Sequence, residues 1–161
     1  MPTVDRATRA ELGTLVDQWV ALAEEQRDHG SLLATDANRE TIAHSFERAI
    51  EDGRLLVARD DGELCGFVHL TLPLGSFVRT ASVGTVENLY VEPDRRNAGI
   101  GTRLLEAGEH RLAELGVETV RIAVMVDNDA ARRLYRRRGY RPRRSILHRE
   151  VETNTSPSDV G

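Results

Sequence analysis

Two glycines at the start of a predicted helix carry the clearest chemical signal in the sequence. The run Arg96–Gly101 follows an alternating stretch rich in β-branched residues at 83–91, and it precedes apolar residues at helical spacing in 102–112. The first turn of a helix has backbone N–H groups without partners and the positive end of the helix dipole, so it binds phosphate groups. Gly99 and Gly101 would let an anionic group approach the backbone closely. The sequence therefore predicts a site for a phosphorylated cofactor.

Two common phosphate-binding loops do not fit this run. The dinucleotide motif G-x-G-x-x-G needs a third glycine at position 104, where Leu104 stands. The P-loop needs a lysine, and the chain has none. An ordinary strand–helix connection with two turn glycines remains the alternative.

A second motif lies at residues 128–140, which read NDAARRLYRRRGY. Asn128 suits a helix N-cap, and Ala131, Leu134 and Tyr135 share one helical face. Gly139 suits the residue that ends the helix. This run resembles the pattern N-x-x-A-x-x-L-Y-x-x-x-G-F/Y, and R-x-x-G-x-G at residues 96–101 resembles the acetyl-CoA diphosphate loop of the GCN5-related N-acetyltransferase (GNAT) superfamily. The resemblance covers residues 83–140 with both motifs in the family's order; residues 1–80 contain the expected elements without diagnostic residues.

The resemblance implies acetyl-CoA as co-substrate and assigns its contacts. In this family the strand before the loop splays from its neighbour, and its main chain, here at Leu89 and Val91, pairs with the pantetheine arm. Asn128 is expected to bind that arm, with simple helix capping as the alternative, and Arg96 to help clamp the diphosphate. Arg95 and Arg103 are expected either to contact the 3′-phosphate or to face water. The full predicted set is Leu89, Tyr90, Val91, Arg96, Asn97, Ala98, Gly99, Ile100, Gly101, Thr102, Asn128, Ala131 and Tyr135.

Two side chains are the predicted catalytic pair. Tyr135 is the candidate general acid that protonates the departing thiolate, with core packing as its alternative. Glu87 is the candidate general base, directly or through water; we expect apolar neighbours around it and a bulge near Asn88 and Leu89. The alternative for Glu87 is a solvent-facing or arginine-paired carboxylate, and Asn88 is another polar group for orienting the amine. The five histidines have no metal-ligand spacing, and no motif for a covalent nucleophile occurs, so no metal is predicted.

The predicted function is N-acetyl transfer from acetyl-CoA to a primary amine by direct attack in a ternary complex. A non-catalytic acyl-CoA sensor of the same fold is the first alternative. Nucleic-acid binding by the arginine-rich run at 132–144 is the second, although the net charge of −4 and the few aromatic residues disfavour it. The acceptor, a small-molecule amine or a peptide or protein N-terminus, is not identified by the sequence. Residues 24–35 and 141–145 are expected to shape its pocket.

The periodicity predicts an α/β chain in the order β-α-α-β-β-β-α-β-α-β. Helices are expected at about 8–27 and 36–51, strands at 54–59 and 63–72, and a last strand at about Ser145–Val151. The family's fold is a mixed, mostly antiparallel sheet with helices on both faces. Residues 1–151 are predicted to form a single domain, and 152–161 a disordered tail.

Composition bears on the environment of the chain. Residues 1–94 carry 17 acidic and 8 basic side chains, while 95–161 carry 9 and 14, so the basic part holds the predicted phosphate loop. No run is long and apolar enough to span a bilayer, and the start has no signal-peptide character. The single Cys65, read as a small core residue, suits a reducing compartment, so we expect a cytoplasmic protein. A homodimer through the last strands is left open.

Overall fold

The computed structural model describes residues 1–73, 75 and 77–153. Its strands and α-helices, in chain order, are β1 (Thr3–Arg6), α1 (Leu12–Asp28), α2 (Arg39–Asp52), β2 (Leu55–Asp60), β3 (Glu63–Thr71), β4 (Val83–Val91), α3 (Ile100–Glu114), β5 (Thr119–Ile122) and α4 (Asp129–Arg137). Short 3-10 turns precede α1, α2 and α3. The predicted order is confirmed through α4.

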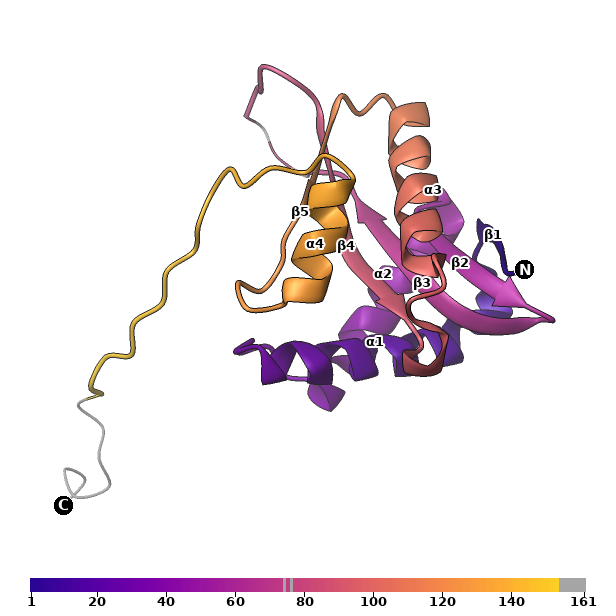
Figure 1. Ribbon diagram of the computed structural model, residues 1–161, viewed down its shortest axis with the longest axis horizontal. Helices are drawn as coiled ribbons and strands as arrows, with labels where there is room; N and C mark the ends of the chain where they lie inside the picture. Colours follow the sequence, from indigo (N-terminus) through magenta and orange to yellow (C-terminus); the bar gives the residue numbers. More distant parts are fainter. Residues whose placement is uncertain (74, 76, 154–161) are drawn as a thin grey trace.

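The five strands form one sheet in the order β1-β2-β3-β4-β5 (Figure 1). The pairs β1–β2, β2–β3 and β3–β4 are antiparallel, and β5 runs parallel to β4. β2 and β3 are joined by a tight turn at Asp61 and Gly62, both of which have positive φ, as a two-residue hairpin requires. The mixed, mostly antiparallel sheet is therefore confirmed.

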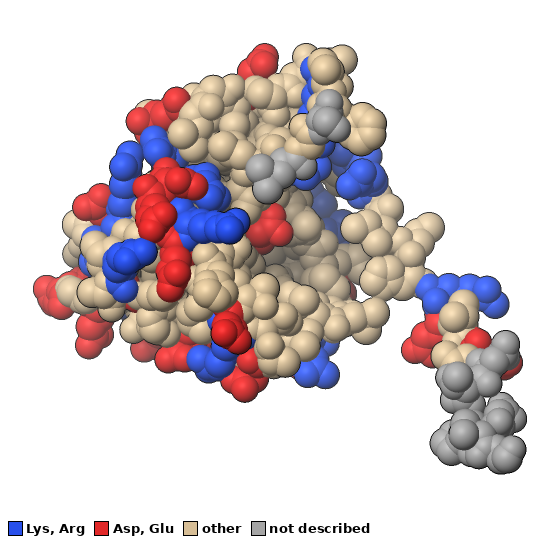
Figure 2. Space-filling view, turned by 180° about the vertical axis from the view of Figure 1, so that it is seen from behind, with Lys and Arg blue, Asp and Glu red and all other residues tan. Residues whose placement is uncertain are grey.

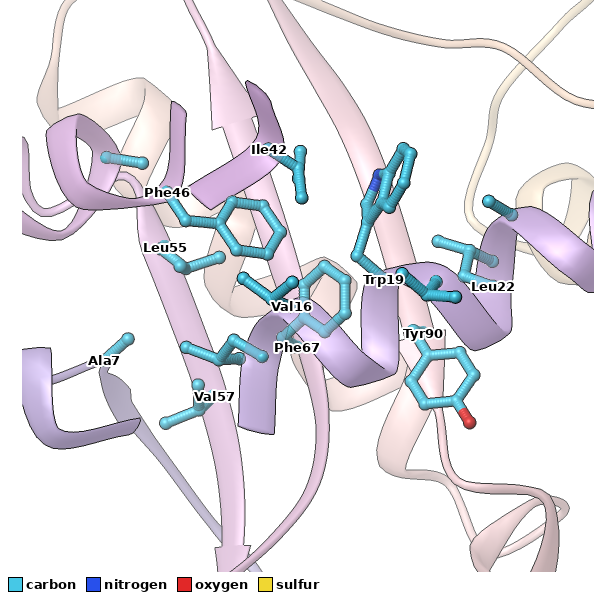
Figure 3. Close-up of a cluster of buried hydrophobic side chains, with 14 residues drawn as sticks. Ala7, Val16, Trp19, Leu22, Ile42, Phe46, Leu55, Val57, Phe67 and Tyr90 are labelled. Carbon is cyan, nitrogen blue, oxygen red and sulfur yellow. The ribbon is translucent and has the colours of Figure 1, made fainter. Parts of the chain in front are cut away.

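Two apolar layers cover the sheet. On one face α1 and α2 pack over alternate residues of β2, β3 and β4, around the fully buried Phe46 and Phe67 (Figure 3). On the other face α3 packs through Leu104, Leu105 and Leu112. Cys65 is buried in this second layer, as predicted. The two layers hold β3 and β4 rigidly at the centre of the domain.

The capping box of Thr8 and Glu11 comes directly before α1, which begins at Leu12. Glu11 accepts from the Thr8 backbone N–H at 2.8 Å, the contact expected of a capping box. The Glu11 carboxylate also accepts from the Arg59 guanidinium at 2.7 and 2.8 Å. That pair lowers the pKa of Glu11 to about 2. The start of α1 is thereby fixed to β2.

The prediction of a last strand at about Ser145–Val151 is wrong. Residues 145–151 have no backbone pairing, and Figure 1 shows this segment leaving the body of the molecule. Its apolar side chains are exposed, with Leu147 at 90% and Ile146 at 77%. Alternation of apolar residues is local, but a strand also needs a neighbour to complete its hydrogen bonds, and this segment does not reach the edge of β5. Of the predicted tail, residues 154–161 lie outside the described part of the chain.

Candidate active site

β4 parts from β5 in the middle of its length. The parallel pairing covers only Val83–Val86 opposite Thr119–Ile122, so the second half of β4 has no neighbour on that side in the described chain. The Glu92 backbone N–H donates to Cys65 of β3 at 2.7 Å, and the groups of alternate residues in an antiparallel ladder point the same way. Those of Leu89 and Val91 therefore point to the open side. This is the expected splay: on this side the Leu89 and Val91 main-chain groups have no β5 partner in the described chain, and the Val91 carbonyl accepts from Arg96 Nε at 2.8 Å.

The loop before α3 has the geometry of an anion site. Asn97 and Gly99 both have positive φ, 63° and 83°, and Gly99 is the N-cap of α3 with no side-chain hydrogen bond to the helix. Residues 97–99 are exposed, whereas Ile100 is buried and anchors the first turn. The first N–H groups of α3, through Thr102, lack side-chain caps and are left for a ligand.

Gly101 faces the space between β4 and α4. A Cβ built on Gly101 would lie 3.7 Å from both Val91 and Leu134, which is ordinary contact. The loop, the open edge of β4 and Leu134 of α4 therefore lie next to one another, and this junction beside the unpaired part of β4 is the candidate cleft. A separate hollow is seen in Figure 2 on the opposite face of the molecule, away from the face on which α3 and α4 lie in front in Figure 1.

Arg96 does not extend freely from the loop. Its Nε donates to the Val91 carbonyl at 2.8 Å, and its guanidinium pairs with Glu25 of α1 at 2.7 Å. The guanidinium also lies 5.6 Å from the centre of the Tyr90 ring. A clamp on a diphosphate would require Arg96 to leave these partners.

The other predicted arginines are also occupied. Arg95 pairs with Asp60 at 2.5 Å and contacts the Cys65 sulfur, and Arg103 donates to the Pro2 carbonyl. Tyr90 itself is buried under α1, and its hydroxyl donates to Glu92 at 3.3 Å. Its side chain therefore packs in the layer under α1 and α2, and a contact of Tyr90 with the cofactor stays a prediction.

Tyr135 lies on α4 with its ring against the α3 layer. It packs edge-on to Tyr140 at 6.0 Å between ring centres. The Tyr140 hydroxyl is committed to Glu109 at 2.7 Å, whereas the Tyr135 hydroxyl has no hydrogen bond to any part of the chain that the structure describes. Burial raises the pKa of Tyr135 to about 12, so the phenol keeps its proton at neutral pH. Such a group can donate a proton but is a poor base.

Asn128 caps α4. Its Oδ1 accepts from the Ala131 backbone N–H at 3.2 Å, which confirms the capping contact. This bond leaves the Asn128 amide N–H₂ as the group that could reach a ligand. Next to it, Asp127 Oδ1 accepts a hydrogen bond from His29 Nδ1 at 2.9 Å. That contact joins the end of α1 to the loop before α4.

Glu87 lies at a bulge in β4. His69 pairs with Asn88 and Leu70 with Val86, so Glu87 is the extra residue, one position before the expected site. The expectation of apolar neighbours is wrong: Glu87 is exposed, and its Oε2 accepts from Thr71 Oγ1 at 3.0 Å. The bulge interrupts the alternation of the strand and brings the side chains of Glu87 and Asn88 against Thr71 and His69, which share one face of β3.

Sequence reasoning missed His69. It counted this residue only among the scattered histidines, but His69 is 3% exposed in the central strand, and its Nδ1 lies 3.1 Å from the Asn88 amide nitrogen. The available signal was the alternation that puts His69 on the same face of its strand as Phe67. No group of three metal-binding side chains gathers anywhere in residues 1–73, 75 and 77–153. Within the same ranges, no helix is long and apolar enough to cross a membrane.

Comparison with known proteins agrees with this architecture. The acetyltransferase (GNAT) family matches residues 17–140, and the chain belongs to that family. A mycothiol acetyltransferase of Sanguibacter keddieii is 34% identical over 113 residues, which are 70% of this chain and 35% of that protein. The chain thus spans about a third of the length of that relative.

Solved structures show the same fold at low sequence identity. A GCN5-related N-acetyltransferase from Ralstonia eutropha has a TM-score of 0.72 at 20% identity, covering 93% of this chain and 99% of its own. A protein from Clostridium acetobutylicum described as a predicted acetyltransferase, solved with acetyl-CoA, has a TM-score of 0.69 at 17% identity, covering 93% of this chain and 96% of its own. The fold of this chain is therefore the GNAT fold.

Proposed function

We propose that residues 1–151 form one transferase domain that moves an acetyl group from acetyl-CoA to a primary amine. One observation carries the proposal: β4 parts from β5 at the point where the uncapped start of α3 and the apolar face of α4 converge. The cleft fits acetyl-CoA on chemical grounds. Uncapped N–H groups suit its diphosphate, and the edge of β4 that lacks a β5 partner suits the amides of its pantetheine arm.

The residues of this chain have separate tasks in the proposal. Leu89 and Val91 bind the arm through their main chain, and residues 96–102 bind the diphosphate. The side-chain N–H₂ of Asn128 binds the arm beside Ala131. Arg96 moves from Glu25 to the diphosphate, which replaces a half-exposed ion pair with a stronger charge pairing.

The proposed transfer is balanced in atoms and charge. Acetyl-CoA supplies the acetyl group as an activated thioester. The acceptor ammonium loses a proton to Glu87, directly or through water; its nitrogen then forms a bond to the acetyl carbon, and the carbon–sulfur bond breaks. Tyr135 donates its proton to the sulfur and regains one as the amide nitrogen is deprotonated. Much of the rate comes from holding the two substrates side by side.

The relatives support the reaction type. One is named a mycothiol acetyltransferase, and a structural neighbour was solved with acetyl-CoA. The acceptor of this chain is a small-molecule amine or a peptide N-terminus, and the cytoplasm and the homodimer stay predictions. The sensor alternative differs from the proposal in one respect, since it would bind acetyl-CoA without turnover.

A matched pair of tyrosine variants tests the proposal. Thiol release from acetyl-CoA is measured with a panel of amines for the wild type, Tyr135→Phe and Tyr140→Phe. We expect Tyr135→Phe to lower kcat by about 100-fold with little change in acetyl-CoA affinity. Tyr140→Phe, which removes only the contact with Glu109, should keep most of the turnover. Equal turnover in Tyr135→Phe and wild type would refute the acid role, and tight binding without any turnover would favour the sensor.

A further inference from the structure

His69 is a buried polar side chain that the proposed reaction does not use. It lies in the central strand, and its ring packs edge-on against Phe46 with 5.1 Å between ring centres. A buried polar group has to be hydrogen-bonded to be tolerated. The contact that His69 makes within the described chain is with the amide nitrogen of Asn88, its direct neighbour across the β3–β4 ladder.

The direction of that hydrogen bond follows from the chemistry of the two groups. Burial, with a smaller contribution from the nearby charge of Arg54, lowers the pKa of His69 to about 4, so the ring is neutral at physiological pH. An amide nitrogen is only a donor, so Nδ1 of His69 accepts and Nε2 carries the proton. With the proton on Nε2, the bond holds the Asn88 amide in this orientation, because turning the amide over would place its oxygen against the lone pair of Nδ1.

Fixing the nitrogen of Asn88 also fixes its oxygen. Oδ1 makes no hydrogen bond to the described chain, and it is not sealed from solvent, since Gln18 Oε1 is the one buried side-chain oxygen or nitrogen in those residues without a partner. Asn88 is next to Glu87, and the bulge turns both toward the same face of β3, where Thr71 donates to one oxygen of Glu87. Consecutive residues of the bulge thus carry two acceptor groups, a carboxylate and an amide oxygen.

We propose that Asn88 Oδ1 binds an N–H of the acceptor amine beside Glu87, and that His69 is the positioning residue that holds Asn88 in this orientation. The inference rests on the proposed function and extends it by naming how the amine is recognised. A primary amine has enough N–H groups to donate to both oxygens, and after it loses a proton one N–H can still donate to Asn88. The arrangement therefore favours primary amines, and it would discriminate against tertiary amines and hydroxyls.

Kinetics of variants that keep the core filled test the positioning role. His69→Leu keeps an apolar filling against Phe46 but removes the acceptor, and we expect the acceptor KM to rise about 5- to 10-fold, the value of one hydrogen bond, with acetyl-CoA affinity unchanged. His69→Asn offers an oxygen near the place of Nδ1 and should recover part of the loss. In a protein that already carries Asn88→Ala, adding His69→Leu should not raise the acceptor KM further. Val57 is fully buried on the same face of the sheet and has an apolar side chain. Val57→Ala should therefore lower stability without removing a polar contact, and the acceptor KM should stay unchanged.

A measurement that needs no turnover separates this inference from the proposed function. In wild-type protein the side-chain N–H₂ signal of Asn88 in nitrogen-15 NMR should show a hydrogen-bonded proton, which His69→Leu abolishes. Adding an amine of the panel should shift that signal in wild type. A shift without thiol release would leave the amine site standing and refute the transferase. Thiol release with no shift, or with an unchanged acceptor KM in both His69→Leu and Asn88→Ala, would overturn the inference.

Discussion

The buried, neutral His69 makes the stability of the fold sensitive to mild acid. Its pKa is about 4 in the folded protein against 6.5 for an ordinary histidine, so between these values the unfolded chain binds a proton that the folded chain does not. The free energy of unfolding must therefore fall as the pH falls from about 6.5 toward 4. The full effect below that window would be about 3 kcal/mol, from 1.36 kcal/mol for each pKa unit.

The effect can be isolated by difference. Between pH 7 and pH 5, proton linkage for these two pKa values gives a loss of about 2 kcal/mol from His69 alone. Urea unfolding of wild type and His69→Leu at both pH values measures it, because the other titrating groups are common to the two proteins and cancel. We expect the wild type to lose about 2 kcal/mol more than the variant between the two pH values. A difference below about 0.5 kcal/mol would refute a neutral, buried His69, and with it the direction of the hydrogen bond from Asn88.

Three further predictions follow from other contacts. Glu11→Gln should destabilise the protein by about 1–3 kcal/mol in urea unfolding at pH 7, because it leaves the partly buried Arg59 without its carboxylate; the difference from wild type should shrink as the pH falls from 4.5 toward 2, since the lowered pKa of Glu11 confines its contribution to higher pH. Gly66→Ala would place its Cβ 2.3 Å from the Tyr90 carbonyl oxygen, so it should lower stability by more than about 2 kcal/mol and disturb β4; an unchanged melting temperature would contradict the close approach of β3 and β4. Glu25→Gln should change stability by less than about 1 kcal/mol, because the pair with Arg96 is half-exposed, and should strengthen acetyl-CoA binding severalfold in calorimetry by releasing Arg96; weaker binding would show that Glu25 supports the site.

The sequence was most informative where function depends on the backbone. The glycines at 99 and 101 and the alternation in 83–91 predicted the uncapped start of α3 and the strand beside it, because both depend on local conformation. The splay of β4 from β5 came with the family resemblance. The orientation of the Leu89 and Val91 main chain depends only on strand periodicity and register, and their contact with acetyl-CoA stays a prediction.

Side-chain partners were harder to predict because they depend on distant residues. Arg96 meets Glu25, 71 positions away, and the Tyr90 side chain turns toward α1. Glu87 was expected among apolar side chains, but a bulge of one residue turned it to the polar side chain of Thr71. The prediction of a last strand was wrong for a related reason, since residues 145–151 have the right alternation but no neighbouring strand to pair with.

The central claim is that the cleft at the start of α3 binds acetyl-CoA, and a calorimetric titration with a pair of glycine variants tests it most directly. Gly101 and Gly13 are each the second residue of a helix, and in neither would an alanine methyl meet a steric obstacle in the protein. Both alanine variants should fold at least as well as wild type, since alanine favours a helix by about 1 kcal/mol over glycine. The account predicts saturable binding of acetyl-CoA at one site per chain, weakened about 10-fold or more by Gly101→Ala, whose methyl occupies the cleft, and unaffected by Gly13→Ala. No binding to wild type, or equal binding to both variants, would contradict it.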